Sequence, residues 1–154
     1  MTGKVAIVTG SSRSIGAAVA KCLGEHGANV VVNYIKDAKS AENVVQSIRS
    51  QGKGGAIAVK ADASTVEGGR LLIREAVKTF GRIDILVLNA GLAGNRTLAD
   101  VDEAFYDAHF NMNVKAPLFM AKSAAPLLQS RTPFFFLWPL FFIILETMAY
   151  YNQT

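Results

Sequence analysis

Short apolar runs alternate with longer stretches of helical periodicity along most of the chain. The apolar runs at residues 5–8, 29–33, 56–60 and 83–88 are almost continuously hydrophobic, as strands covered on both faces must be. The stretches between them place apolar residues three and four positions apart, which predicts helices. This alternation is typical of βαβ units, so the sequence predicts an α/β fold with a parallel sheet.

Three helices are predicted between these strands, over about residues 15–26, 40–51 and 64–80. In the first helix one face carries apolar side chains, which are those of Ile15, Val19, Cys22 and Leu23. The third helix is expected to open with a capping box at Ser64 and Glu67, which satisfies two backbone N–H groups reciprocally. It is expected to stop at Gly81, because glycine readily ends a helix.

The last predicted helical segment follows a loop. Residues 91–99 form this loop after the fourth strand, and helical sequence runs from about 102 to 130. Pro117 and Pro126 are expected to divide or end the helix, because proline lacks a backbone donor and its ring crowds the preceding turn.

The composition changes abruptly after Arg131. Residues 133–145 contain five of the nine Phe residues and the only Trp, so the composition of this part differs sharply from that of the rest of the chain. We therefore expect one incomplete α/β domain over residues 1–130 and a divergent apolar tail, rather than a second domain, over residues 131–154.

Three interpretations of this tail are open. Residues 134–138 or 141–145, with Pro139 between them, could pair with the fourth strand, whose apolar edge would otherwise be an aggregation hazard. The tail could instead pack poorly, or join chains into an oligomer or aggregate through a large apolar patch. It could also result from a frameshift, a retained intron or alternative splicing, which is the origin that the abrupt change favours.

Charge and cysteine content limit the classes of partner. The formal net charge is +4, but the Lys and Arg residues are spread from Lys4 to Arg131, which favours a phosphate-bearing small molecule over nucleic acid. Cys22 is the single cysteine, so no disulfide framework or metal site is expected, and the chain is predicted to be cytoplasmic. The apolar run at residues 133–145 is shorter than the roughly twenty residues that cross a bilayer, so no membrane span is expected.

The first predicted strand is followed by a glycine-rich turn and then by the first helix. The turn has the sequence Thr9-Gly10-Ser11-Ser12-Arg13-Ser14-Ile15-Gly16. Gly10 permits a tight turn, and Gly16 permits close packing of the helix on the strand. Free backbone N–H groups and the helix dipole favour an anion at such a helix start, so the sequence predicts a pyrophosphate site here.

This turn resembles the Thr-Gly-x-x-x-Gly-x-Gly turn of the short-chain dehydrogenase/reductase family, and two further segments match in the same order. Asp62 falls where the family has an Asp that contacts adenine, and residues 81–91 resemble its Gly-x-x-Asp-x-Leu-Val-x-Asn-Ala-Gly segment. Over residues 1 to about 130 the resemblance implies the N-terminal part of a Rossmann-like, doubly wound parallel sheet with about four βα units, truncated before its second half. The cofactor-binding residues that these matches imply are Gly10, Ser12, Arg13, Ser14, Ile15, Gly16, Asn33, Asp62, Asn89, Ala90 and Gly91.

Two positions bear on how the cofactor is bound and on whether it is NAD or NADP. Ser14 occupies the place of the middle glycine of the family's turn, where its hydroxyl could donate to a phosphate oxygen. The second strand ends in Asn33 and Tyr34 instead of the acidic residue with which NAD-preferring folds bind the ribose. Arg13 can pair with a 2′-phosphate, as the resemblance to NADP-preferring members implies, so we expect NADP.

The resemblance also implies a catalytic set that the chain carries only in part. Family members transfer a hydride with a Tyr as acid/base, a Lys four residues later that lowers the pKa of this Tyr, and a Ser that orients the substrate. Asn113 resembles the helix Asn that completes the set. No Tyr in the chain is followed four residues later by a Lys, and no Ser occurs after Ser130.

Two functional interpretations follow. In the first, the chain belongs by lineage to NADP-dependent oxidoreductases of carbonyls and alcohols, and residues 30–48 look most like members that act on polyols, sugars or aromatic ketones. In the second, this form is a non-catalytic dinucleotide-binding fragment or an aberrant truncated product. The missing Tyr and Lys favour the second interpretation for the chemistry of the chain itself.

Overall fold

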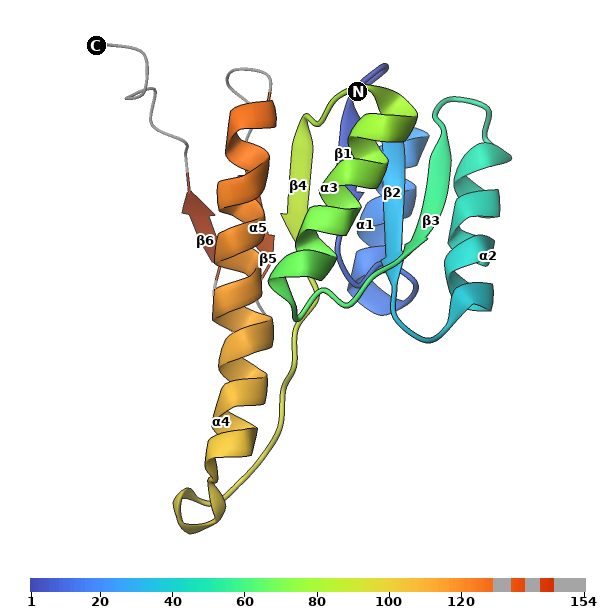
Figure 1. The fold of residues 1–154 in the computed structure, drawn as a ribbon. Helices are drawn as coiled ribbons and strands as arrows, with labels where there is room; N and C mark the ends of the chain where they lie inside the picture. The colour runs from blue at the N-terminus through green and yellow to red at the C-terminus, as the bar shows by residue number, and fades with distance from the viewer. Residues whose placement is uncertain (129–133, 138–141, 146–154) are drawn as a thin grey trace, which may run out of the picture.

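A computed structural model describes residues 1–128 and the backbone of residues 134–137 and 142–145. The strands form one sheet in the order β3-β2-β1-β4-β5-β6 (Figure 1). Their bounds are Val5–Val8 for β1, Asn29–Tyr34 for β2, Ala56–Lys60 for β3, Ile85–Leu88 for β4, Phe134–Leu137 for β5 and Phe142–Leu145 for β6. Each pairing is parallel except that of β6 with β5. The predicted α/β fold with a Rossmann-like parallel sheet is confirmed.

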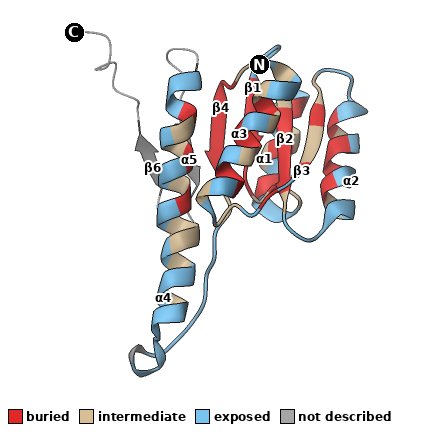
Figure 2. Ribbon diagram, in the orientation of Figure 1, coloured by how far each residue is buried: buried red, intermediate tan, exposed pale blue. Residues whose placement is uncertain are grey.

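Helices cover both faces of the sheet (Figure 1). Their bounds are Ser14–Glu25 for α1, Ala38–Arg49 for α2, Val66–Phe80 for α3, Glu103–Phe110 for α4 and Ala116–Ala124 for α5. α1 and α2 pack against Ala6 and Val8 of β1, whereas α3 and α5 pack against Val5 and Ile7. Because successive residues of a strand point to opposite faces, all of β1 is buried (Figure 2). In the part of the chain that the structure describes, no helix has the length and apolar character needed to span a membrane.

Helix α1 packs mainly through small residues, and two of the four residues predicted for its apolar face, Val19 and Leu23, are only partly buried against the core. Its buried residues are Gly16, Ala17, Ala20 and Gly24. Ile15 is 60% exposed, and Cys22 is exposed as well. A Cβ on Gly24 would lie 2.5 Å from Cγ2 of Ile48 on α2. The two helices approach too closely for large side chains, so the larger residues of α1 lie at the edge of the contact.

Helix α3 is capped by Thr65, so the capping box predicted at Ser64 and Glu67 is wrong. Oγ1 of Thr65 accepts a hydrogen bond from the backbone N–H of Gly68 at 3.0 Å. The Ser64 hydroxyl instead donates to Oδ1 of Asp62 at 2.7 Å, which draws it away from the helix start. The predicted end of the helix is confirmed, because Gly81 adopts the left-handed conformation there, with φ 79°.

The helical segment after β4 is interrupted directly before Pro117. A π-helical turn at Asn111–Lys115 separates α4 from α5. Pro117 follows this turn as the second residue of α5 and cannot donate to the carbonyl oxygen four residues earlier, so the division expected at Pro117 lies beside it. Pro126 lies in the 3₁₀ turn Ala125–Leu127, which ends the described helical segment as expected.

Two segments of the tail extend the sheet. β5 pairs with β4 in a register that places Phe134 beside Leu86 and Phe136 beside Leu88. Of the alternatives left open for the tail, pairing of residues 134–138 with the fourth strand is thus observed for β5, residues 134–137. The other predicted segment also forms a strand, β6, but it pairs with β5. Trp138, Pro139 and Phe141 lie outside the described residues.

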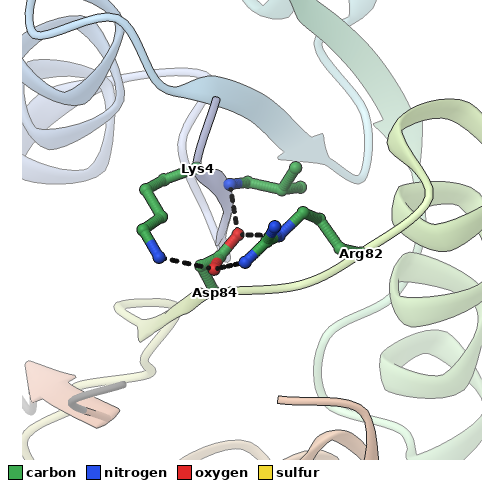
Figure 3. Close-up of polar contacts among 4 residues, drawn as sticks. Lys4, Arg82 and Asp84 are labelled. Atoms are coloured by element: carbon green, nitrogen blue, oxygen red, sulfur yellow. Dashed lines mark hydrogen bonds and ion pairs between the residues drawn. The ribbon is translucent and has the colours of Figure 1, made fainter. Parts of the chain in front are cut away.

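A buried carboxylate connects the amino ends of β1 and β4. Asp84 accepts hydrogen bonds from Nζ of Lys4 at 3.1 Å and from the N–H of Val5 at 3.0 Å (Figure 3). Nε and Nη2 of Arg82 donate to the same carboxylate at 2.8 and 2.6 Å. Burial alone would raise the pKa of Asp84, but these hydrogen bonds outweigh burial and hold the pKa below its ordinary value of 3.8. The ionised carboxylate thus helps to align the two strands whose opposite ends border the site.

Candidate functional site

The carboxyl ends of β1, β2 and β4 border a cavity of about 470 Å³. Open α/β sheets bind ligands at this edge. Ten of the eleven predicted cofactor-binding residues line the cavity, namely Gly10, Ser12, Arg13, Ser14, Ile15, Gly16, Asn33, Asn89, Ala90 and Gly91. The eleventh, Asp62, lines a second cavity of about 520 Å³. Ile35 and Met112 line both cavities, which therefore adjoin.

The turn after β1 closes against the segment that follows β4. Gly10 has φ 62°, and a Cβ at this position would lie 3.1 Å from Cα of Ala90. A Cβ on Gly16 would lie 2.5 Å from Nδ2 of Asn89 and 2.5 Å from the carbonyl oxygen of Gly10. This close approach leaves no room for a side chain at Gly16 and requires the left-handed conformation at Gly10.

Asn89 and Thr9 hold these two segments together. Nδ2 of Asn89 donates to the carbonyl oxygens of Thr9 at 2.9 Å and of Gly10 at 3.2 Å. In return, the hydroxyl oxygen of Thr9 accepts from the N–H groups of Asn89 and Ala90, each at 2.9 Å. The amide nitrogen of Asn89 is thus engaged in shaping the turn, and Thr9 is a structural partner that the sequence analysis did not single out.

The start of α1 differs from the starts of the three helices that follow it. Asp37, Thr65 and Asp102 cap α2, α3 and α4, each through a side-chain oxygen that accepts a backbone N–H. Arg13, at the N-cap position of α1, makes no such bond. The first-turn N–H groups of α1 are therefore available to an anion at the cavity.

Ser14 adopts a backbone conformation that favours glycine. Among the residues that the structure describes, it is the one non-glycine residue with a positive φ, which is 53°. This is the position at which Ser replaces the middle glycine of the turn. The exposed Ser14 lines the cavity, beside the uncapped start of α1.

Asn33 lies at the cavity, but its amide is engaged within the fold. The residue is only 2% exposed. Its Oδ1 accepts from the N–H of Gly10 at 2.9 Å, and its Nδ2 donates to the carbonyl oxygen of Ala61 at 2.9 Å. Asn33 therefore braces the glycine-rich turn against the segment that follows β3.

The sequence analysis missed the residues that follow β2. Lys36 and Asp37 line the same cavity as Arg13. The end of β2 carries no carboxylate, but the structure brings Asp37 to the cavity. A signal was present, because Asp37 follows Gly16 by about twenty residues, the spacing at which dinucleotide folds place a ribose-binding acid.

Asn113 lies in the π-helical turn and is engaged by the loop after β4. Its Oδ1 accepts from the N–H of Leu92 at 2.9 Å, and its Nδ2 donates to the carbonyl oxygen of Leu92 at 2.8 Å. Leu92 lines the second cavity together with Lys115. Asn113 thus positions the loop that borders the site, and its role in a reaction remains a prediction.

Comparison with known proteins identifies the family. The model of the short chain dehydrogenase family matches residues 4–133. The chain belongs to this family. A hydroxynaphthalene reductase of Aspergillus fumigatus is 41% identical over 124 residues, which make up 80% of this chain and 45% of that protein. The chain spans about half the length of the curated relatives that it matches.

Solved structures of short chain dehydrogenases share the fold. One from Burkholderia cenocepacia, in complex with NADP, has a TM-score of 0.82 and 39% identity, with 86% of this chain and 54% of that chain covered. An NADH-dependent reductase in complex with NAD has a TM-score of 0.77 and 34% identity, with 82% and 52% covered. The match to about half of each structure agrees with a chain that represents the N-terminal part of the family's fold.

Proposed function

We propose that the chain binds a nicotinamide adenine dinucleotide at the two adjoining cavities. The observation that carries this proposal is the uncapped start of α1 beside a turn in which Gly16 has no room for a side chain. Free backbone N–H groups and the helix dipole suit a pyrophosphate at this position. The cavities of about 470 and 520 Å³ leave room for further parts of the dinucleotide. The family of the chain supports the same ligand class.

The residues of the turn are proposed to hold the phosphates, and Asp62 is proposed to bind the adenine. Oδ1 of Asp62 accepts from the N–H of Ser64 at 2.9 Å and from its hydroxyl at 2.7 Å. Both bonds use the same oxygen, so Oδ2 can accept from the adenine amino group. Asn89, Ala90 and Gly91 complete the wall of the first cavity opposite the turn.

NADP is proposed as the preferred dinucleotide. Arg13 is exposed at the first cavity, and its guanidinium can form paired hydrogen bonds with a 2′-phosphate. The proposal depends on this residue, because the solved relatives include one complex with NADP and one with NAD.

For the protein as a whole, the proposed reaction is hydride transfer to or from a carbonyl or alcohol carbon. The nicotinamide supplies or accepts the hydride when it is bound. The name of the hydroxynaphthalene reductase supports the predicted branch that acts on polyols or aromatic ketones.

This chain contains no Tyr-x-x-x-Lys, so for the chain by itself we propose cofactor binding without turnover. Within it, Asn113 has a positioning role through Leu92.

Two further expectations belong to the same proposal. A reducing, cytoplasmic location is supported by the single cysteine, Cys22, which has no partner for a disulfide. Self-association through the tail is supported by the apolar composition of residues 133–145. Size-exclusion chromatography over a range of protein concentrations tests the second expectation, and an unchanged elution volume at all concentrations would contradict it.

A fluorescence titration of the purified chain with NADPH tests the binding. We expect saturable binding by the wild type and its loss in Gly16→Ala, because the added Cβ would lie 2.5 Å from Nδ2 of Asn89. Gly52→Ala is the control for a general loss of stability: a Cβ on Gly52 meets no atom within 4 Å, but the φ of 66° there strains any side chain, so this variant weakens the fold away from the site and should still bind. Absence of binding to the wild type would contradict the proposal.

An activity assay separates binding from turnover. The chain is incubated with NADPH and a series of hydroxynaphthalene-type and simple ketones, and NADPH oxidation is followed by absorbance. We expect binding without oxidation. Oxidation at rates ordinary for enzymes, on the order of 1 s⁻¹ or faster, would contradict the proposal that this form only binds.

A further inference from the structure

The loop after β4, residues 91–97, runs beside α4 (Figure 1). A Cβ on Gly94 would lie 3.2 Å from Nε2 of His109 and 3.0 Å from Cε2 of Phe105, so the backbone of the loop packs directly against these two rings. The centroids of the two rings are 4.0 Å apart. The guanidinium carbon of Arg96 lies 5.6 Å from the centroid of Phe105, in a cation–π contact. Gly94 and Arg96 thus fasten the loop to α4.

Nε2 of His109 is buried under this loop. Among the residues that the structure describes, it is the one buried side-chain nitrogen or oxygen without a hydrogen-bond partner. Nδ1 of the same ring lies 2.7 Å from the carbonyl oxygen of Phe105. Because a carbonyl oxygen only accepts, Nδ1 carries the hydrogen, and Nε2 of the neutral ring is a bare acceptor. The proton that charges the ring must therefore be added at Nε2, against the backbone of Gly94.

A proton on Nε2 does not suit the closed loop. The new N–H would be buried without an acceptor, and a buried charge without a partner is costly. The charged group that the loop brings to these rings is Arg96, which is also a cation. On α4 itself, the carboxylate of Asp102 shares the face of His109 but caps the helix about two turns away, at roughly 10 Å. The ring is therefore neutral under the loop, and a charged ring needs the loop to open.

His26, the other histidine of the chain, makes the same local bond without such a cover. Its Nδ1 lies 2.8 Å from the carbonyl oxygen of Cys22, four residues earlier, as Nδ1 of His109 does from that of Phe105. His26 is exposed, so a proton on its Nε2 meets water. The two histidines differ in what lies over Nε2, and His26 is an internal reference for His109.

The loop also forms part of the wall of both cavities. Gly91 lines the first cavity and Leu92 lines the second. Opening of the loop at Gly94 would therefore loosen a wall of the proposed nucleotide site, two residues beyond Leu92.

We propose that His109 is a pH-sensitive switch for this loop: the neutral ring keeps the loop against α4, and protonation of Nε2 releases it. Histidine changes its charge between about pH 5 and 8, so acidification through this range opens the loop. A proton that binds the open form and a dinucleotide that binds the closed form oppose each other, so the affinity for the dinucleotide falls as the pH falls. This effect on affinity rests on the proposed function, whereas release of the loop does not.

Nuclear magnetic resonance of the isotope-labelled chain without nucleotide tests the release. The ring signals of both histidines and the backbone order parameters of Gly94 and Arg96 are measured from about pH 7.5 to about pH 5.5. As the ring of His109 takes up its proton, we expect these order parameters to fall from about 0.85, typical of rigid backbone, to below about 0.6. Order parameters that stay constant while His109 becomes protonated would overturn the proposal.

Two variants assign the effect to His109. His109→Asn has no titratable nitrogen and keeps an amide that can donate in the place of Nδ1, so its loop should not respond to pH. His26→Asn is the matched control, because it removes the histidine with the same local bond, and its loop should respond as in the wild type. A loop that responds equally in His109→Asn would refute the switch. His109→Phe, which also lacks a titratable nitrogen, is used if His109→Asn does not fold.

Calorimetric titration with NADP tests the effect on binding. The 2′-phosphate of NADP itself takes up a proton near pH 6, so the wild type is compared with His109→Asn at each pH. From about pH 7.5 to about pH 5.5 we expect the wild type to lose about threefold to tenfold more affinity than the variant, since one proton changes an affinity by at most about tenfold per pH unit.

The outcomes separate the switch from the proposed function. If NADP binds and its affinity has the same pH dependence in the wild type and in His109→Asn, regulation by His109 is refuted and the binding site stands. If the loop opens with protonation of His109 but NADP binds at neither pH, the switch stands and the proposed function is refuted.

Discussion

Oδ1 of Asn33 accepts a hydrogen bond from the backbone N–H of Gly10 at 2.9 Å. This bond joins the end of β2 to the turn that follows β1. Because Nδ2 of the same amide donates to the carbonyl oxygen of Ala61 at 2.9 Å, Asn33 links the carboxyl ends of three neighbouring strands. An asparagine suits this position because its side-chain amide offers both an acceptor oxygen and a donor nitrogen.

Asn33→Asp is predicted to weaken the fold rather than to convert the chain to NAD. The carboxylate keeps the acceptor for Gly10 but loses the donor, and it brings a negative charge against the carbonyl oxygen of Ala61. We expect the free energy of unfolding to fall by about 2–3 kcal/mol, measured by urea denaturation at pH 7. NADH and NADPH binding should weaken together. Unchanged stability with a new preference for NADH would contradict this prediction.

Ser14→Gly is predicted to stabilise the chain. A non-glycine residue in the left-handed region, such as Ser14 at φ 53°, costs roughly 1–2 kcal/mol. Glycine removes this cost but adds flexibility to the unfolded chain, so we expect a net gain of about 0.5–1 kcal/mol in the free energy of unfolding. Ser14→Ala keeps the strain and is the control, for which no gain is expected. Equal stabilities of the Gly and Ala variants would show that the backbone at this position is not strained.

Asp84→Asn is predicted to destabilise the chain in a pH-dependent way. The substitution removes the negative charge that pairs with Lys4 and Arg82 and leaves one acceptor oxygen in place of two, so we expect a loss of about 2 kcal/mol at pH 7. In the folded state the pKa of Asp84 lies below its ordinary value of 3.8, and the unfolded chain therefore binds the proton more readily. The contribution of the carboxylate is full well above pH 3.8 and is lost as the pH falls through the lowered pKa.

Urea denaturation from pH 7 down to pH 3 measures this dependence. The difference in unfolding free energy between the wild type and Asp84→Asn should be constant near neutrality and should shrink in the acid range. Asp102→Asn serves as the control, because Asp102 is an exposed carboxylate. A difference that stays the same down to pH 3 would indicate that Asp84 contributes through its shape and not through its charge.

The elements that a sequence can predict are those governed by neighbouring residues. The near-continuous apolar runs placed β1 and β3 at their observed bounds, and β2 within one residue of them, because strands between two layers of helices consist mostly of apolar residues. The end of α3 at Gly81 was predictable for a similar local reason, since glycine adopts the left-handed conformation of this helix end without a steric penalty.

The errors lie where distant segments decide the outcome. The packed face of α1 depends on Ile48 of α2, which selects small residues that no periodicity of α1 alone reveals. Ser64 is withdrawn from the cap of α3 by Asp62, whose competing bonds the capping pattern does not include. The inward orientation of Asn33 and the arrival of Asp37 at the cavity both depend on where neighbouring strands end, which is a property of the assembled sheet.

The pairing of β1 with β4 sets the order in which the molecule can fold. Hydrogen bonds join Thr9 to Asn89, which follows it by 80 residues in the sequence. The turn is therefore among the first segments to be synthesised and among the last to form all of its hydrogen bonds. Contacts this distant in sequence delay folding, because the chain loses much of its freedom before they form. During synthesis the turn after β1 therefore stays unfinished until β4 has emerged, and the proposed nucleotide site does not exist before that moment.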